Sequence, residues 1–366
     1  MTNRTIRPGA VMLDTHGKRI EAHGGGILRV EETFYLYGEN KEKSVEGADI
    51  WHWGVRAYAS RDLVQWEDQG YIIPPVLDDE SSPLHPTSQM DRPHILYNES
   101  TGKFVAWLKI VGHDHIQSFT IMTADRFLGP YTTVTRGYRP FGFSAGDFDL
   151  DIDEATGRAY VFFQKVHTHI VVAPLSDDYL SAAEPYRLEL YRELPPAVRE
   201  APVHFTRNGK HYLITSGTSH YRPNPSEVAI ADDIMGPYRD LGNLHPDDTS
   251  LTSYGTQISD VIRVPGTDFY FAIGDRWLPD VTDARPYLDT YTKGTRLIAK
   301  FLGLERTQRL LSAQRKPPRK RRRVKNYNTA FSNYVWLPIR FEQDSPIIDW
   351  HNEWSMPDVD RDPTAH

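Results

Sequence analysis

Three carboxylates and one amide each stand at the start of a short strand-like run that ends in aromatic residues. They are Asp91, Asp147, Glu200 and Gln257, and a fifth run of the same shape carries Gly24 at the matching position. If the four side chains shared one pocket, a protonated carboxyl group could protonate the leaving oxygen of a glycoside while a second group held and deprotonated water. Residues of these types therefore indicate glycoside hydrolysis.

The spacing of the five positions indicates the architecture that would bring them together. The steps between them are 67, 56, 53 and 57 residues, and each interval holds several strand-like runs. A repeat of this length, built from short strands, is typical of a β-propeller, whose innermost strands begin at the central axis. We therefore predict an all-β chain in which residues 1–366 form a single five-bladed β-propeller.

One segment, residues 283–327, breaks the repeat and is predicted to be an insertion in the last blade. Its apolar residues Leu297, Phe301, Leu304 and Leu311 have helical spacing, and residues 315–325 hold eight basic side chains. We expect an amphipathic helix followed by a basic loop. The loop is read as a solvated segment in preference to a nuclear-import or polyanion-binding patch. The strand expected at residues 332–341 would close the ring with blade one.

Composition narrows the class of protein. The hydrophobic content is 39%, and no apolar run approaches the roughly 20 residues that span a bilayer, so we expect a soluble protein without a membrane partner. The absence of cysteine excludes disulfides and thiolate catalysis. Outside the basic run the net charge is about −15, which argues against nucleic acid as a partner. The first residues lack the apolar core of a signal peptide, which favours a cytoplasmic location unless a signal has been removed.

Among the carboxylates, Glu200 is predicted to be the acid, because it precedes Ala-Pro at a strand start and its longer side chain reaches into a pocket. Asp147 would be the like-charged neighbour that keeps the pKa of Glu200 high. Each carboxylate alone could equally be an ordinary strand-end residue, but four polar groups in register favour a shared site. From the residues alone, Asp91 is a reasonable group to activate water.

Five segments together resemble glycoside hydrolase family 43, and within it the exo-β-1,3-galactanases (galactan 1,3-β-galactosidases). They are HGGGILRVEETFYLYGENK, MDRPHILYN, GDFDLDID, REAPVHFTRNGKHYLITSG and YGTQISDV. The resemblance runs from about residue 10 to 280, resumes at YVWLPI and leaves out the insertion. It implies a five-bladed propeller, an inverting mechanism and an oligo- or polysaccharide substrate.

The resemblance also assigns roles to residues. It places the catalytic acid at Glu200, the carboxylate that tunes it at Asp147, and a glutamine that holds the nucleophilic water at Gln257. Most of the family has an aspartate base at the position of Gly24, which this branch lacks. Asp91 stands where the branch usually has glutamate, and this departure leaves open both the exact sugar and whether Asp91 or Gln257 holds the water.

Further residues are expected to contact the substrate. Two of them, Glu39 and Asn40, follow the first strand pair, and the others are Trp51 and Trp53, which could form a stacking wall, with Tyr221, Tyr254 and Arg276. His113 and His115 form only a two-ligand pair and are read as polar rim residues, so no metal ligand is predicted. The resemblance implies no required cofactor and leaves open a structural Ca²⁺ in the axial channel.

Three hypotheses follow from the sequence. The first is an exo-acting hydrolase that inverts configuration and releases terminal galactose from β-1,3-galactan. The second keeps the chemistry but makes the chain a β-D-galactofuranosidase or an α-L-arabinofuranosidase. The third is a non-catalytic propeller that binds glycans or proteins.

Overall fold

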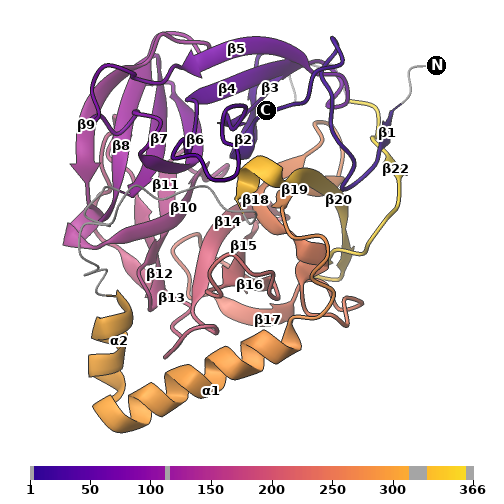
Figure 1. The fold of residues 1–366 in the computed structure, drawn as a ribbon. Helices are drawn as coiled ribbons and strands as arrows, with labels where there is room; N and C mark the ends of the chain where they lie inside the picture. The colour runs from indigo at the N-terminus through magenta and orange to yellow at the C-terminus, as the bar shows by residue number, and fades with distance from the viewer. Residues whose placement is uncertain (1–3, 112–115, 313–327, 360–366) are drawn as a thin grey trace.

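The computed structural model describes residues 4–111, 116–312 and 328–359. Within these ranges the chain forms five four-stranded antiparallel sheets, arranged as blades around one axis (Figure 1). The predicted five-bladed β-propeller is therefore confirmed. Each blade runs outward from its innermost strand in sequence order, so every sheet is a simple meander of neighbouring strands.

The strands of the blades have the following bounds. The first two blades comprise β2 (His23–Val30), β3 (Thr33–Glu39), β4 (Val55–Ser60) and β5 (Glu67–Ile73), then β6 (Gln89–Asn98), β7 (Lys103–Val111), β8 (Gln117–Ala124) and β9 (Thr132–Tyr138). The third and fourth comprise β10 (Ala145–Ile152), β11 (Ala159–Lys165), β12 (His169–Pro174) and β13 (Arg187–Glu189), then β14 (Arg199–Arg207), β15 (Lys210–Gly217), β16 (Glu227–Ala231) and β17 (Arg239–Asn243). The fifth comprises β18 (Gln257–Arg263), β19 (Tyr270–Arg276), β20 (Asn333–Glu342) and β21 (Ser345–Ile347).

All five innermost strands carry the same irregularity near their first residues. The register against the second strand shifts by one residue between His23 and Gly26 in β2, and an equivalent shift occurs in β6, β10, β14 and β18. A bulge of this kind bends the strand and re-aims the side chains beside it. In four blades the shifted stretch contains the position singled out in the sequence, and in β18 it begins one residue after Gln257.

Among the described residues no strand is shared between blades one and five, and the ring closes through side-chain contacts between them. β20, which was expected to close the ring with blade one, pairs with β19 and β21 inside blade five. Its Tyr334 hydroxyl accepts a hydrogen bond of 2.7 Å from the Ala22 amide of blade one. The ring of Trp336 meets Trp66 of blade one edge-on at 6.0 Å. A separate pair, β1 (Thr5–Ile6) with β22 (Trp354–Ser355), joins the two ends of the described chain.

The predicted insertion contains two helices, α1 (Arg285–Leu302) and α2 (Leu304–Ser312), between β19 and β20. Gly303 separates them with a φ of +78°, a conformation that L side chains rarely adopt. The two helices lie at the edge of the propeller in Figure 1. The basic run at 315–325 lies outside the described residues. In the part of the chain that is described, no helix has the length and apolar character to cross a membrane.

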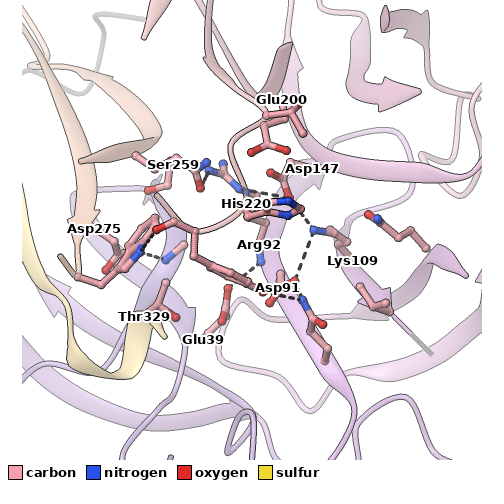
Figure 2. A pocket seen from close by; sticks show the side chains of 18 of the residues that line it. Glu39, Asp91, Arg92, Lys109, Asp147, Glu200, His220, Ser259, Asp275 and Thr329 are labelled. Carbon is pink, nitrogen blue, oxygen red and sulfur yellow. Dashed lines mark hydrogen bonds and ion pairs between the residues drawn. The ribbon is translucent and has the colours of Figure 1, made fainter. Parts of the chain in front are cut away.

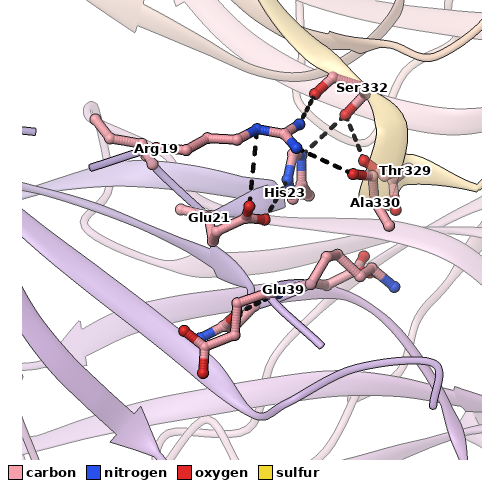
Figure 3. Close-up of polar contacts among 12 residues, drawn as sticks. Arg19, Glu21, His23, Glu39, Thr329, Ala330 and Ser332 are labelled. Atoms are coloured by element: carbon pink, nitrogen blue, oxygen red, sulfur yellow. Dashed lines mark hydrogen bonds and ion pairs between the residues drawn. The ribbon is translucent and has the colours of Figure 1, made fainter. Parts of the chain in front are cut away.

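A buried ionic cluster also fastens blade one to blade five (Figure 3). His23 Nδ1 lies 2.6 Å from Asp275 Oδ1 of β19, and His23 Nε2 lies 3.1 Å from Glu21 Oε2. The Ser332 hydroxyl, just before β20, donates to the same Asp275 oxygen at 2.6 Å. Burial alone would lower the pKa of His23, but Asp275 and then Glu21 outweigh it and raise the pKa to about 9. His23 is therefore charged at neutral pH.

This cluster predicts a pH dependence of stability. Because the folded pKa of His23 lies above its ordinary value of 6.5, its contribution is complete below about pH 6.5 and is lost as pH rises through about 9. The shift corresponds to roughly 3 kcal/mol. We expect His23→Gln to lower the free energy of urea unfolding at pH 6 and to flatten its decline toward pH 9.

The matched control is His16→Gln, which changes an exposed histidine. The free energy of unfolding of His16→Gln should decline from pH 6 to pH 9 as that of wild type does. This decline contains the contributions of all other groups that titrate in this range. An identical pH profile for His23→Gln and His16→Gln would show that the cluster does not stabilise the closed ring.

Candidate active site

A cavity of about 460 Å³ lies at the end of the axis where the inner strands begin. All four predicted polar residues line it, together with the glycine of the fifth run: Gly24, Asp91, Asp147, Glu200 and Gln257. The structure thus brings together one position from each blade, and Figure 2 shows Asp91, Asp147 and Glu200 turned into the same space. The bulges described above place these side chains at the rim of the axial channel.

Glu200 and Asp147 form a pair of carboxyl groups with opposite protonation. Burial and then the negative charge of Asp147 raise the pKa of Glu200 to about 8. Asp147 is also buried, but its Oδ1 lies 2.6 Å from Lys109 Nζ and 3.8 Å from Arg92 Nε. The charges of Lys109 and Arg92 outweigh that burial and lower the pKa of Asp147. At neutral pH the pair therefore consists of a protonated acid beside a carboxylate.

Asp91 is held in its ionised form by three neighbours. Its Oδ1 accepts a hydrogen bond of 2.9 Å from Trp51 Nε1, and its Oδ2 accepts one of 2.8 Å from Gln89 Nε2. Lys109 Nζ lies 3.4 Å from the same Oδ2. Although burial would raise the pKa of Asp91, Lys109 and Lys41 lower it. The lowered pKa makes Asp91 a weak base.

The amide of Gln257 is fixed at both ends. Its Oε1 accepts a hydrogen bond of 2.9 Å from Arg92 Nη2, and its Nε2 donates to Ser216 Oγ at 3.0 Å. An amide oxygen accepts two hydrogen bonds and an amide nitrogen donates two, so each end keeps one position for a further partner. Gln257 can therefore orient a water molecule.

Glu39 occupies the space above the glycine of blade one. A Cβ atom added to Gly24 would lie 2.8 Å from Glu39 Oε1, and Gly24 has a φ of +60°, so an aspartate there would displace Glu39 and strain the backbone. The carboxylate of Glu39 lies 2.7 Å from Lys41 Nζ and accepts a hydrogen bond from the Arg92 amide at 2.9 Å. Burial nevertheless raises the pKa of Glu39.

The remaining predicted contact residues divide into two groups. Trp51 and Tyr221 line the cavity with Glu39. Asn40 is fully buried behind it, where its Oδ1 accepts from the Glu42 amide at 2.8 Å, so it shapes the loop.

Three other predicted contact residues lie away from the cavity. Trp53 is not among the residues that line it, and Lys43 covers its ring at 3.8 Å. Tyr254 and Arg276 line a separate small hollow. His113 and His115 lie outside the described residues.

Several pocket residues were missed by sequence reasoning. Arg92 and Lys109 carry the positive charges of the site, and Asp275 and Ser259 line it from blade five. Arg92 directly follows Asp91, so adjacency to a predicted site residue was an available signal. Lys109 lies opposite Asp91 in the β6–β7 pair, a position that depends on the bulge. Among the described residues, no group of three or more His, Cys, Asp or Glu side chains could hold a metal ion.

Fold and site together define a class of protein. The axial pocket of the propeller holds a protonated carboxyl group beside an ionised one, and acid-assisted hydrolysis of a glycoside requires such a proton donor. The family model "Glycosyl hydrolases family 43" matches residues 22–273. The chain therefore belongs to glycosyl hydrolases family 43.

Solved structures with the same fold include a β-1,3-galactosidase and two exo-β-1,3-galactanases. A family 43 β-1,3-galactosidase is 25% identical with a TM-score of 0.74, and the match covers 97% of this chain and 64% of that one. An exo-β-1,3-galactanase from Phanerochaete chrysosporium is 23% identical with a TM-score of 0.74, covering 97% and 69%. One from Clostridium thermocellum is 25% identical with a TM-score of 0.72, covering 97% and 67%.

The chain thus spans less than two thirds of the first of these three proteins. Among curated protein sequences, none matches this chain significantly.

The carboxyl pair yields a direct prediction. In Asp147→Asn the pKa of Glu200 should fall from about 8 toward its ordinary value of 4.5, because the neighbouring negative charge is lost while Lys109 and Arg92 remain. The carbonyl stretch of protonated Glu200, identified by its absence in Glu200→Gln, can be followed by infrared spectroscopy from pH 4 to 10. The control Asp232→Asn removes an exposed carboxylate and should leave the titration unchanged. A Glu200 titration that Asp147→Asn does not move would sink the assigned pairing.

Proposed function

We propose that the protein is an exo-acting glycoside hydrolase that inverts configuration and releases terminal galactose from β-1,3-galactan. The observation that carries the catalytic part is the protonated Glu200 beside the ionised Asp147. The galactan part is supported by the resemblance of five segments and by the descriptions of the similar structures.

Glu200 is the proposed general acid. A pKa of about 8 keeps it protonated at neutral pH, so it can donate its proton to the glycosidic oxygen as the bond breaks. The carboxylate left behind lies beside Asp147, and the nearby positive charges of Lys109 and Arg92 reduce the repulsion between the two anions. Asp147 itself does not transfer a proton; it sets the pKa of the acid.

Gln257 is proposed to hold the attacking water, in preference to Asp91. The amide keeps one open acceptor and one open donor position, whereas the carboxylate of Asp91 can only accept, and Trp51, Gln89 and Lys109 take three of its roughly four acceptor positions. In an oxocarbenium-like transition state the water attacks an already electron-poor carbon. Its orientation then matters more than early removal of its proton, so a weakly basic group is sufficient. The proton of the water leaves to solvent once the new C–O bond has formed.

Exo action is supported by the shape and size of the site. The cavity of about 460 Å³ is lined by side chains from all five blades and from the insertion. Volumes of this order enclose a small ligand on most sides. A terminal sugar can enter such a cavity, whereas an internal residue of a long chain would need an open groove that continues in both directions.

The test is a digest of β-1,3-galactan and a panel of nitrophenyl glycosides with wild type and Glu200→Gln. We expect wild type to release galactose from chain ends. Glu200→Gln should lower kcat by about 10²–10⁴-fold on galactan, because the proton donor is lost, while galactose still binds. In the same digest Gln257→Ala should lower kcat more than Asp91→Asn does.

The other outcomes discriminate between the hypotheses. Activity on furanosides alone would keep the mechanism and replace the substrate with a galactofuranoside or an arabinofuranoside. Equal activity of wild type and Glu200→Gln on galactan would contradict the assignment of the acid. If wild type binds galactosides but hydrolyses no member of the panel, the proposed hydrolase function on these sugars is wrong.

A further inference from the structure

The helical insertion contributes directly to the catalytic pocket. Tyr291 of α1 and Leu310 and Leu311 of α2 line the same cavity as Glu200. These residues lie outside the segment that matches the family model, which ends at residue 273. The insertion therefore adds a wall to the pocket that the matched segment of the chain does not provide.

The two helices are fixed to blade four, which also carries the acid. Thr295 Oγ1 is buried and donates to the Pro195 carbonyl at 2.8 Å. Gln308 Nε2 of α2 donates to the Glu193 carbonyl at 3.0 Å. Both acceptors lie in the connection between β13 and β14, a few residues before Glu200. The wall is therefore held in a defined position relative to the acid.

Ring contacts hold α1 against the pocket rim. The ring of Tyr291 stacks on His220, with centroids 5.4 Å apart and an interplanar angle of 18°. Tyr291 lies close enough to Glu200 for the carboxyl group to raise the pKa of the phenol, after the larger effect of burial. Glu200 must reach the glycosidic oxygen in order to protonate it. Side chains that lie beside Glu200, such as Tyr291, therefore lie beside the leaving group. Figure 2 shows His220 near Glu200 and Asp147.

The two residues that α2 contributes to this wall are apolar. Leu310 is 53% exposed although it lines the cavity, and Leu311 is half-buried beside it. Val111 and Trp277 continue the apolar lining. Leucine and valine side chains have no hydrogen-bonding groups with which to recognise hydroxyls. They stabilise a bound ligand only by removing apolar area from water.

We propose that α1 and α2 form the leaving-group subsite, and that α2 contributes to it an apolar contact made by Leu310 and Leu311. This rests on the proposed function for the position of the acid. The subsite accepts a substituted sugar or an aryl or alkyl group, and Leu310 is its specificity-determining residue. The sugar that is cleaved off is selected separately, at the axial end of the cavity.

The test compares binding of phenyl and methyl 1-thioglycosides, which resist hydrolysis, by calorimetry with the full chain. The pairs are made with β-galactopyranose, β-galactofuranose and α-arabinofuranose. For whichever sugar binds, wild type should prefer the phenyl compound, and Leu310→Ser should reduce that preference by about fivefold, as expected for losing part of one aliphatic contact. Affinity for the methyl compound should stay unchanged.

Leu297→Ser is the matched control, because Leu297 is 56% exposed on α1 and lines neither cavity described above. It should bind both compounds as wild type does. Leu311→Ser is a second variant that should also lower the phenyl preference. Thermal unfolding midpoints should agree among all variants.

The outcomes separate this inference from the proposed function. Equal binding of phenyl and methyl galactopyranosides would show that the proposed leaving-group subsite is wrong. It would not contradict galactopyranose as the sugar that is cleaved off. A Leu310-dependent phenyl preference seen only with a furanose supports the subsite and overturns galactopyranose as the substrate. An equal loss in Leu310→Ser and Leu297→Ser overturns the role of Leu310, and no binding of any compound overturns both proposals.

Discussion

The site depends on one backbone feature that is repeated five times, the bulge near the start of each inner strand. One extra residue per strand rotates the side chains beside it out of the regular alternation and toward the axis. Because the five strands surround a common axis, the same small irregularity brings residues more than 200 positions apart in the sequence into one cavity. The ring must stay closed for this to hold. Closure relies on packing and on the buried His23 cluster, since the chain has no cysteine.

The distribution of charge then decides which carboxyl group is protonated at neutral pH. Lys109 contacts both Asp91 and Asp147, and Arg92 adds a second positive charge near Asp147. These two carboxylates stay ionised, whereas burial and the charge of Asp147 keep Glu200 protonated. Protonation states are thus set by position within the bulged ring and not by residue type, since Asp and Glu have similar ordinary pKa values.

Regular features of the sequence were enough to predict the blades and the polar residue near the start of four of the five inner strands, with Gly24 at the matching position of the fifth. The charged partners were not predictable in the same way. From the pairing of Asn98 with Lys103, an unbroken ladder would place Asp91 opposite Ile110, but the bulge moves it opposite Lys109. Tyr291, Leu310 and Leu311 were missed because the place where an insertion packs depends on distant contacts. Tyr254 and Arg276 were expected beside the substrate, yet the η2 turn (Ser253–Gly255) and the end of β19 direct them to a different hollow.

The central claim is a single displacement, in which Glu200 donates a proton while a water held by Gln257 attacks from the opposite face. The most direct measurement is proton NMR spectroscopy of the first turnovers of β-1,3-galactobiose, recorded before the released sugar equilibrates. Inversion predicts that α-galactose appears first and that the β anomer forms later by mutarotation. If β-galactose appears first, a carboxylate acts as a nucleophile and the roles assigned to Gln257 and the carboxyl pair are wrong.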